Sequence, residues 1–279
     1  MSKLFTIDIH THILPENIPN FKEKFGYGGF INLDHHKPCC ARMMKDDTFF
    51  REVQDNCWDA ETRMRECGEQ HVDVQIGTHI DVHNPEDMQK PGHRNLDAPE
   101  VFQVLEACEK LDMAVFIHPW DMIAKEKMQK YWLPWLVGMP AESSLALCSL
   151  IFSGTFEKLP KLRVAVAHGG GSFPATLARI QHGFDVRPDL CAIDNTVSPT
   201  KTMGKFWLDS LVHDPKMLQY IVDLVGADRV ALGTDYPFPL GELEPGKLIN
   251  GMPWKDEQKE MLLSGSALEW LNLNRSYFE

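Results

Sequence analysis

Short apolar runs alternate along this chain with stretches in which apolar residues recur every three or four positions. The runs are rich in strand-forming residues, which predicts six buried strands. These are Thr6–His12, Val72–Thr78, Met113–Ile117, Leu162–Ala167, Lys205–Leu208 and Arg229–Gly233. The helical spacing predicts helices at Asp59–Gln70, Ala98–Leu111, Ala141–Ser153, Phe173–Gln181 and Pro215–Val225, and one or two more between Asp256 and Leu271. Strands that alternate with helices indicate a parallel sheet with right-handed crossovers.

Three stretches depart from this alternation. Two of them, Asp81–Asp97 and the aromatic, proline-rich Tyr131–Pro140, are predicted to be loops. In the third, residues 21–55, the apolar runs Phe30–Leu33 and Phe49–Val53 are predicted to pair as a hairpin excursion. In the helix that follows, Asp59 is expected to cap the N-terminus and Arg63 and Arg65 to lie on the surface.

The strands read as near-continuous apolar segments such as V-A-V-A and V-A-L-G, which is typical of strands covered on both faces. No G-x-G-x-x-G follows the first strand, so the most recognisable mark of a dinucleotide-binding fold is missing. We therefore expect one α/β domain over residues 1–279 with a TIM-barrel-like fold. It has about six β/α units, whereas a closed barrel has eight.

Composition narrows the classes of partner. A formal net charge of −12 argues against nucleic acid and anionic membranes as partners. No apolar run approaches the roughly 20 residues that span a bilayer, and the seven cysteines are scattered, which is typical of reduced thiols. We expect a cytosolic protein that binds a small molecule, because a local cluster of arginines can attract an anionic substrate in an acidic protein.

Polar residues stand at or just after the ends of the predicted strands. They are His10, His12, His79, His118, His168, Asp209 and Asp235. The carboxyl ends of parallel strands form the active face of an α/β barrel, and residues two apart in a strand share a face. Each residue alone has an ordinary explanation, as a core or surface histidine or, for Asp235, as a turn former. Together, three imidazoles and a carboxylate indicate a metal site, with zinc as the expected ion.

His168 precedes three glycines and a predicted helix. Glycines allow the backbone to approach a ligand closely, and the ordinary pKa of imidazole lies near neutral pH. We therefore predict that His168 is the general acid/base, and the alternative is a structural histidine.

Several long motifs carry a resemblance to a known family. They are I-D-I-H-T-H-I-L-P, F-G-Y-G-G, N-C-W-D, H-P-W-D-M, Y-W-L-P-W-L-V-G-M-P-A-E, A-H-G-G-G-S-F-P, H-G-F-D-V-R-P-D-L-C and L-G-T-D-Y-P-F-P-L-G-E-L-E-P-G-K-L-I. Over nearly the whole chain they resemble the 2-amino-3-carboxymuconate-6-semialdehyde decarboxylase family of the metal-dependent amidohydrolase superfamily. The resemblance implies zinc held by His10, His12, His118 and Asp235, with His168 as the acid/base beside the metal.

The resemblance also implies an activity and a substrate site. The activity is non-oxidative decarboxylation of the semialdehyde to 2-aminomuconate 6-semialdehyde in tryptophan and kynurenine breakdown, which limits quinolinate and NAD synthesis. The substrate residues that it implies are Arg51, Lys45, Trp135, Met122 and Phe238, together with Arg179, which in the family reaches the site of a neighbouring subunit. A homodimer is therefore implied. Without the resemblance, Arg51 and Arg179 would be read as surface charges.

The chain departs from the family in one place. V-D-V-Q runs directly into I-G-T-H at Val72–His79, where the family has two further strand–helix units. A barrel that keeps its remaining strands in place has a gap of two strands, each about 4.8 Å wide, whereas a ring that shrinks to close moves His118 relative to His10 and His12. We expect a chain that retains its metal ligands but has lower stability and activity than the full-length family. Two alternatives stay open: a hydrolase of a small amide or lactone, and an inactive form that pairs with intact subunits through its Arg179 region.

Overall fold

The computed structural model describes residues 4–77 and 94–279. The prediction for His79 and most of the predicted loop Asp81–Asp97 lie outside the described residues. The six predicted strands are confirmed and all run parallel. They are β1 (Ile7–Thr11), β5 (Val74–Gly77), β6 (Ala114–Ile117), β7 (Arg163–Val166), β8 (Trp207–Asp209) and β9 (Val230–Ala231).

The strands form an open ring in the order β5–β1–β9–β8–β7–β6. Strands β6 to β9 pair in sequence order, and β1 pairs with β5. The two groups join because the Ile9 amide donates to the Leu232 carbonyl at 2.9 Å and the His12 amide donates to the Tyr236 carbonyl at 2.7 Å. Within the described residues β5 and β6 do not pair. The structure therefore has the gap in the ring, and the neighbouring strands keep their parallel register.

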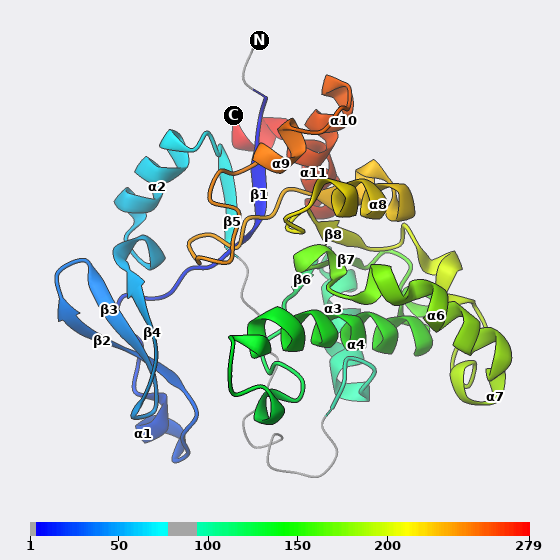
Figure 1. Cartoon of the computed structure of the whole chain (residues 1–279), viewed down its shortest axis with the longest axis horizontal. Coiled ribbons are helices and arrows are strands. Elements are labelled where there is room, and N and C mark those ends of the chain that lie inside the picture. Colours follow the sequence, from blue (N-terminus) through cyan, green and yellow to red (C-terminus); the bar gives the residue numbers. More distant parts are fainter. Residues whose placement is uncertain (1–3, 78–93) are drawn as a thin grey trace.

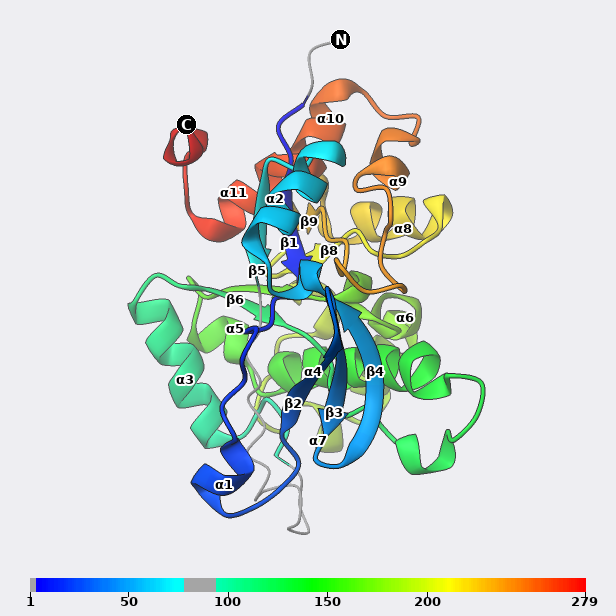
Figure 2. The ribbon, with the colours of Figure 1, turned by 90° about the vertical axis from the view of Figure 1, so that its left-hand side faces the viewer.

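Helices cover the outside of the ring (Figure 1, Figure 2). The longer ones are α2 (Ala60–Glu69), α3 (Pro99–Lys110), α4 (Met139–Phe152), α6 (Phe173–Val186) and α8 (Pro215–Val225). Shorter ones are α1 (Phe21–Phe25), α5 (Thr155–Lys158), α7 (Pro188–Cys191), α9 (Lys247–Asn250), α10 (Asp256–Glu260) and α11 (Ser266–Leu271). The five predicted internal helices are confirmed, with shifts of one or two residues at most boundaries and a longer α6.

Two apolar clusters stabilise this arrangement. The larger one lies between the strands and the outer helices and includes Leu147, Val164 and Leu218, all fully buried. The second joins β1 to the strands around it, where Ile9 and Phe116 pack with Trp270 of α11. Burial of this apolar surface holds the strand ends, and the polar residues on them, in fixed positions.

The excursion after β1 is a three-stranded antiparallel sheet, so the predicted pairing of Phe30–Leu33 with Phe49–Val53 is wrong. Strand β3 (Cys40–Lys45) lies between β2 (Ile31–Lys37) and β4 (Thr48–Gln54) and pairs with both. The sequence signal for β3 is weak because C-A-R-M-M-K contains no β-branched residue. Its alternate residues Ala41 and Met43 are nevertheless buried and form the small core of this sheet.

The predicted loop Tyr131–Pro140 is partly helical. Residues Pro134–Gly138 form a π-helical turn that continues directly into α4. The combined helix Pro134–Phe152 has 19 residues and is long and apolar enough to cross a membrane, so the expectation that no apolar run approaches this length is wrong. Within it Leu147 and Leu150 are fully buried in the protein core, whereas Leu136 and Val137 are exposed.

The core assignment predicts a large difference between two leucines. Leu218 on α8 is fully buried, whereas Leu243 in the loop before α9 is 72% exposed. We expect Leu218→Ala to lower the free energy of unfolding by about 2–5 kcal/mol, because it leaves a cavity between α8 and the sheet. Leu243→Ala should change it by less than about 0.5 kcal/mol in a denaturant titration. Equal effects of the two substitutions would contradict this core.

Candidate metal centre

The carboxyl ends of four strands bring three imidazoles and a carboxylate together. His10 lies on β1, and His118, His168 and Asp235 follow β6, β7 and β9. One potential ligand atom from each of the four residues lies within 4.8 Å of those of the other three. Because parallel strands end at the same edge, their C-terminal residues converge although they are far apart in the sequence.

His12 borders the same cluster. Its Nε2 atom lies 2.7 Å from Oδ1 of Asp235, and its ring centre lies 4.9 Å from that of His118. All five residues predicted for the metal and the acid/base role therefore lie together. The four residues with mutually close ligand atoms are His10, His118, His168 and Asp235. The set implied by the resemblance has His12 instead of His168.

Buried polar atoms in this cluster fit a metal cation. Among the described residues, Nε2 of His10, Nε2 of His118 and Oδ1 of Asp235 are buried without a hydrogen-bond partner of good geometry. Leaving polar atoms buried and unsatisfied is costly. Imidazole nitrogen and carboxylate oxygen are the donors that zinc and similar ions take, so these residues suit such an ion.

Asp209 orients the histidines. Its Oδ2 atom lies 2.6 Å from Nδ1 of His10 and accepts the amide of His168 at 2.9 Å, while its Oδ1 accepts the amide of Gly169 at 2.7 Å. An ionised carboxylate facing Nδ1 favours the proton on that nitrogen and leaves the Nε2 lone pair pointing into the cluster. The sequence marked Asp209 only as a polar strand end, without this role.

The electrostatics of the cluster favour a positive charge. Burial alone would lower the pKa of His10, but the hydrogen bond with Asp209 and the nearby carboxylate of Asp235, 3.4 Å from Nε2, outweigh it and raise that pKa to about 10. Burial lowers the pKa of His168 to about 4, with a further decrease from the neighbouring His10. Two carboxylates thus stabilise one positive charge among neutral rings, and a metal cation supplies such a charge.

Asp8 joins β1 to the loop that carries Asp235. The buried Asp8 carboxylate accepts the amide of Thr234 at 3.1 Å, its hydroxyl at 2.6 Å and the amide of His10 at 3.1 Å. Burial raises the pKa of Asp8 to about 7, although these hydrogen bonds lower it. An acidic residue between the fully buried Ile7 and Ile9 was the available signal for this role, and sequence reasoning missed it.

Three predicted substrate residues meet beside the cluster. The guanidinium carbon of Arg51 on β4 lies 4.5 Å from the ring centre of Phe238 and 5.8 Å from that of Trp135. The ring centre of Phe50, which sequence reasoning missed, lies 5.0 Å from the same guanidinium carbon. The Phe238 ring centre is in turn 4.8 Å from that of His12. Burial lowers the pKa of Arg51, while the charge of Asp235 opposes this shift.

The other predicted substrate residues lie apart from this group or contact it indirectly. Met122 is buried, and its amide donates to the Glu142 carboxylate, which also accepts the amides of Trp120 and Asp121 at 3.0 Å each. Lys45 ends β3 opposite Thr48, and Arg179 is exposed on α6. No described contact links Lys45 or Arg179 of this chain to the metal cluster.

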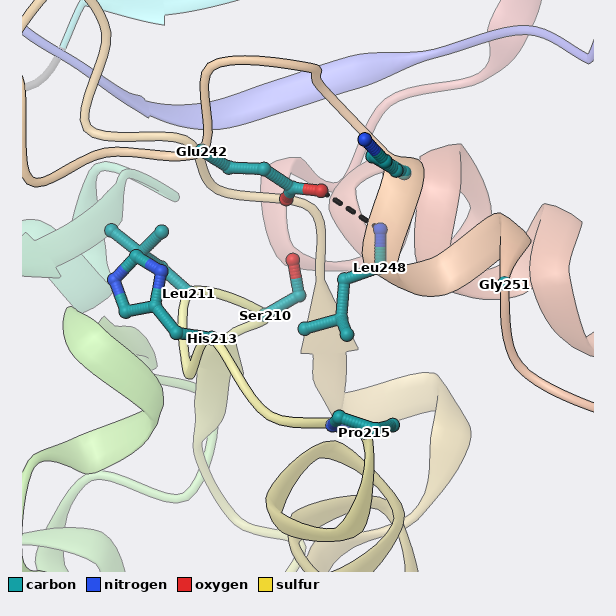
Figure 3. Close-up of a pocket in the computed structure, with 8 residues that line it drawn as sticks. Ser210, Leu211, His213, Pro215, Glu242, Leu248 and Gly251 are labelled. Atoms are coloured by element: carbon teal, nitrogen blue, oxygen red, sulfur yellow. Dashed lines mark hydrogen bonds between the residues drawn. The ribbon is translucent and has the colours of Figure 1, made fainter.

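A separate cavity of about 410 Å³ opens beside the ends of β8 and β9 (Figure 3). It is lined by Ser210, Leu211, His213, Pro215, Glu242, Lys247, Leu248 and Gly251. The Glu242 carboxylate accepts the Leu248 amide at 2.9 Å at the start of α9. None of the predicted site residues lines this cavity.

Comparisons with known proteins identify relatives along most of the chain. The model of the amidohydrolase family matches residues 77–273. The 2-amino-3-carboxymuconate-6-semialdehyde decarboxylase of Dictyostelium discoideum is 46% identical over 96% of this chain and 92% of its own length. The enzyme of the same name from Caenorhabditis elegans is 31% identical over 99% of this chain and 96% of its own length. The Dictyostelium alignment extends over 329 positions, 50 more than the 279 residues of this chain, in keeping with the expected absence of two strand–helix units.

Solved structures share the fold. The apo form of Metarhizium anisopliae IDCase superposes with a TM-score of 0.77 at 16% identity and covers 96% of this chain and 97% of its own. A dihydroxybenzoic acid decarboxylase from Polaromonas, solved with bound manganese and an inhibitor, has a TM-score of 0.59 at 17% identity, covering 78% of this chain and 67% of its own. At these identities the likeness establishes the TIM-barrel-like fold alone.

The role of Asp209 gives a prediction about metal affinity. Asp209→Asn removes the negative charge and leaves one oxygen for four donors, so we expect zinc affinity to fall about 10–100-fold. Asp223→Asn on the exposed face of α8 is the matched control, because Asp223 bonds only the nearby Gln219 among the described hydrogen bonds. Competition with a chromophoric chelator measures both affinities. An unchanged affinity of folded Asp209→Asn protein would contradict the proposed arrangement.

Proposed function

The chain belongs to the 2-amino-3-carboxymuconate-6-semialdehyde decarboxylase family of amidohydrolases, and from this premise we propose that it removes CO₂ from that semialdehyde. Non-oxidative decarboxylation is the activity that the names of its relatives share. The observation that carries the proposal for this chain is the half-buried Arg51 guanidinium next to a cluster suited to a metal. It supports a role for Arg51 as a cation that binds a carboxylate beside the candidate centre.

We propose zinc as the metal, held by His10, His12, His118 and Asp235. The buried, unsatisfied atoms of three of these residues and the short distance between His12 and Asp235 support this set. When bound, such an ion supplies a Lewis acid that lowers the pKa of water to about 7. Asp209 and Asp8 hold the ligand-bearing segments, as their hydrogen bonds to His10 indicate.

Arg51 is the proposed anchor for a substrate carboxylate. Arginine offers five donors in a planar fork that matches a carboxylate, and the fork stays charged at neutral pH. The rings of Phe50, Trp135 and Phe238 lie around this half-buried guanidinium. An ion pair that is partly shielded from water is stronger than one on the surface. Such a local cation would let an acidic protein hold a dianionic substrate.

His168 is the proposed acid/base. When the C–C bond to the carboxylate breaks, CO₂ leaves and the electron pair stays on the substrate carbon, which then takes up a proton. The neutral imidazole of His168 first accepts this proton from water and then donates it to the carbon, and the bond of its amide to Asp209 fixes the residue at the cluster. The left-handed backbone of His168, with φ of 57°, aims the residue away from the course of β7.

A homodimer in the cytosol is the proposed state, acting in tryptophan breakdown and limiting quinolinate and NAD synthesis. Arg179 is exposed on α6, so it is available to a neighbouring subunit. Helix α4 packs beside α6 (Figure 1). The segment from residue 132 through α4 presents large apolar side chains to solvent, and these are Trp132, Leu136, Val137 and Leu145. Burial of such a surface favours association. Because of the gap between β5 and β6, we still predict that this chain is less stable and less active than its full-length relatives.

An assay with the semialdehyde tests the function. We expect zinc-loaded protein to consume it faster than it cyclises spontaneously, to release one CO₂ per molecule, and to lose this activity after chelation. Release of an acid from a small amide or lactone instead would favour the hydrolase alternative. If zinc-loaded, folded protein consumes neither, the decarboxylase proposal is wrong and the inactive alternative stands.

The role of Arg51 predicts a binding defect. We expect Arg51→Gln to raise KM about 10–100-fold, because the substrate loses a charge-assisted hydrogen bond in a partly buried site. Arg42→Gln on the neighbouring strand β3 serves as the control, since Arg42 is exposed and pairs with Asp34 at 3.7 Å. Steady-state kinetics compare the two variants. Equal KM values for Arg51→Gln and Arg42→Gln would refute this assignment.

A further inference from the structure

Arg63 is a buried arginine at the back of the metal centre, and the expectation that it lies on the surface is wrong. It is on α2, and only 8% of the residue is exposed. Its Nη1 donates to the carbonyl oxygens of His12 and Asn56, both at 2.8 Å. Its Nη2 donates to Oε1 of Gln75 on β5 at 2.9 Å. One guanidinium thus joins the end of β1, the edge strand β5 and the segment before α2.

The same guanidinium supports the segment that carries Asp235. Its central carbon lies 4.8 Å from the ring centre of Tyr236, a cation–π distance. The Tyr236 hydroxyl donates to Oε2 of Glu66 at 2.6 Å, one helical turn after Arg63, and Asn56 donates to the same oxygen at 3.2 Å. Arg63 and Glu66 therefore clamp the residue next to Asp235.

The position of α2 explains why such a clamp matters in this chain. Strand β5 borders the gap in the ring and pairs only with β1 among the described strands. Helix α2 lies beside β1 and β5 in both views (Figure 1, Figure 2). Strand β1 pairs with this edge strand and is joined to the β9 side by individual backbone hydrogen bonds, so further contacts help to hold its C-terminal end. Arg63 supplies them at the carbonyl of His12.

We propose that Arg63 is a positioning residue that sets the His12 imidazole and the Asp235 carboxylate at the distance the metal requires. It acts through the His12 carbonyl and the Tyr236 ring and does not contact the metal. The inference rests on the proposed zinc centre. Lysine cannot replace it, because an ammonium group is a point donor and does not span three acceptors on separate segments.

The test measures metal affinity and ligand geometry on full-length chain. Zinc affinity comes from competition with a chromophoric chelator, and the visible absorption of the cobalt-loaded protein reports ligand geometry. We expect Arg63→Met and Arg63→Lys to weaken zinc binding at least about tenfold and to alter the cobalt spectrum. Added guanidinium should partly restore Arg63→Ala. Arg65→Met, two residues along the same helix at an exposed position, should match the wild type.

Several outcomes would overturn the proposal. If folded Arg63→Met binds zinc with wild-type affinity and spectrum, or if it only unfolds at lower temperature while binding is unchanged, Arg63 is merely structural. If Arg63 variants do not fold, Gln75→Leu decides, because it removes one acceptor of the clamp. It should weaken zinc binding in the same direction, and unchanged binding would reject the inference. Failure of the proposed zinc centre itself is distinguishable, because then the wild type binds no zinc.

Discussion

The hydrogen bond between Nδ1 of His10 and Oδ2 of Asp209 is the contact on which the metal centre depends. It is 2.6 Å long and fully buried, and it links β1 to β8 across the ring. The same carboxylate holds the amides of His168 and Gly169 after β7. One ionised group therefore sets the protonation of a candidate ligand and the position of the candidate acid/base. Both functions require the carboxylate to stay charged in the interior, and the hydrogen bonds that it accepts lower its pKa despite burial.

The ring tolerates its gap because of where the candidate ligands lie. Strands β6, β7, β8, β9 and β1 are consecutive neighbours, and every residue of the cluster comes from the ends of these strands. The gap lies between β5 and β6, so it borders one end of this run, and no two neighbouring strands of the run are separated by it. The physical consequence falls on stability, through the edges of β5 and β6 that do not pair with each other among the described residues.

Much of this arrangement could be predicted from the sequence. The alternation of apolar runs with helical spacing identified all six strands, and the histidines at strand ends indicated where they would converge. Contacts that depend on three-dimensional position could not be predicted. Arg63 is a charged residue on a helix and was therefore predicted to lie on the surface. It is buried because α2 packs against β1 and β5. Strand β3 lacked β-branched residues, and the Glu142 carboxylate reaches three amides that lie 20 to 22 residues earlier in the chain.

The central claim is that this open ring assembles one metal centre from His10, His12, His118 and Asp235, with His168 beside it. Anomalous X-ray diffraction at the zinc absorption edge, on crystals of protein loaded with zinc, tests it most directly. The account predicts one strong peak per chain, located among Nε2 of His10, Nε2 of His118 and a carboxylate oxygen of Asp235. A peak at another place, or full zinc loading without a peak among these atoms, would contradict it.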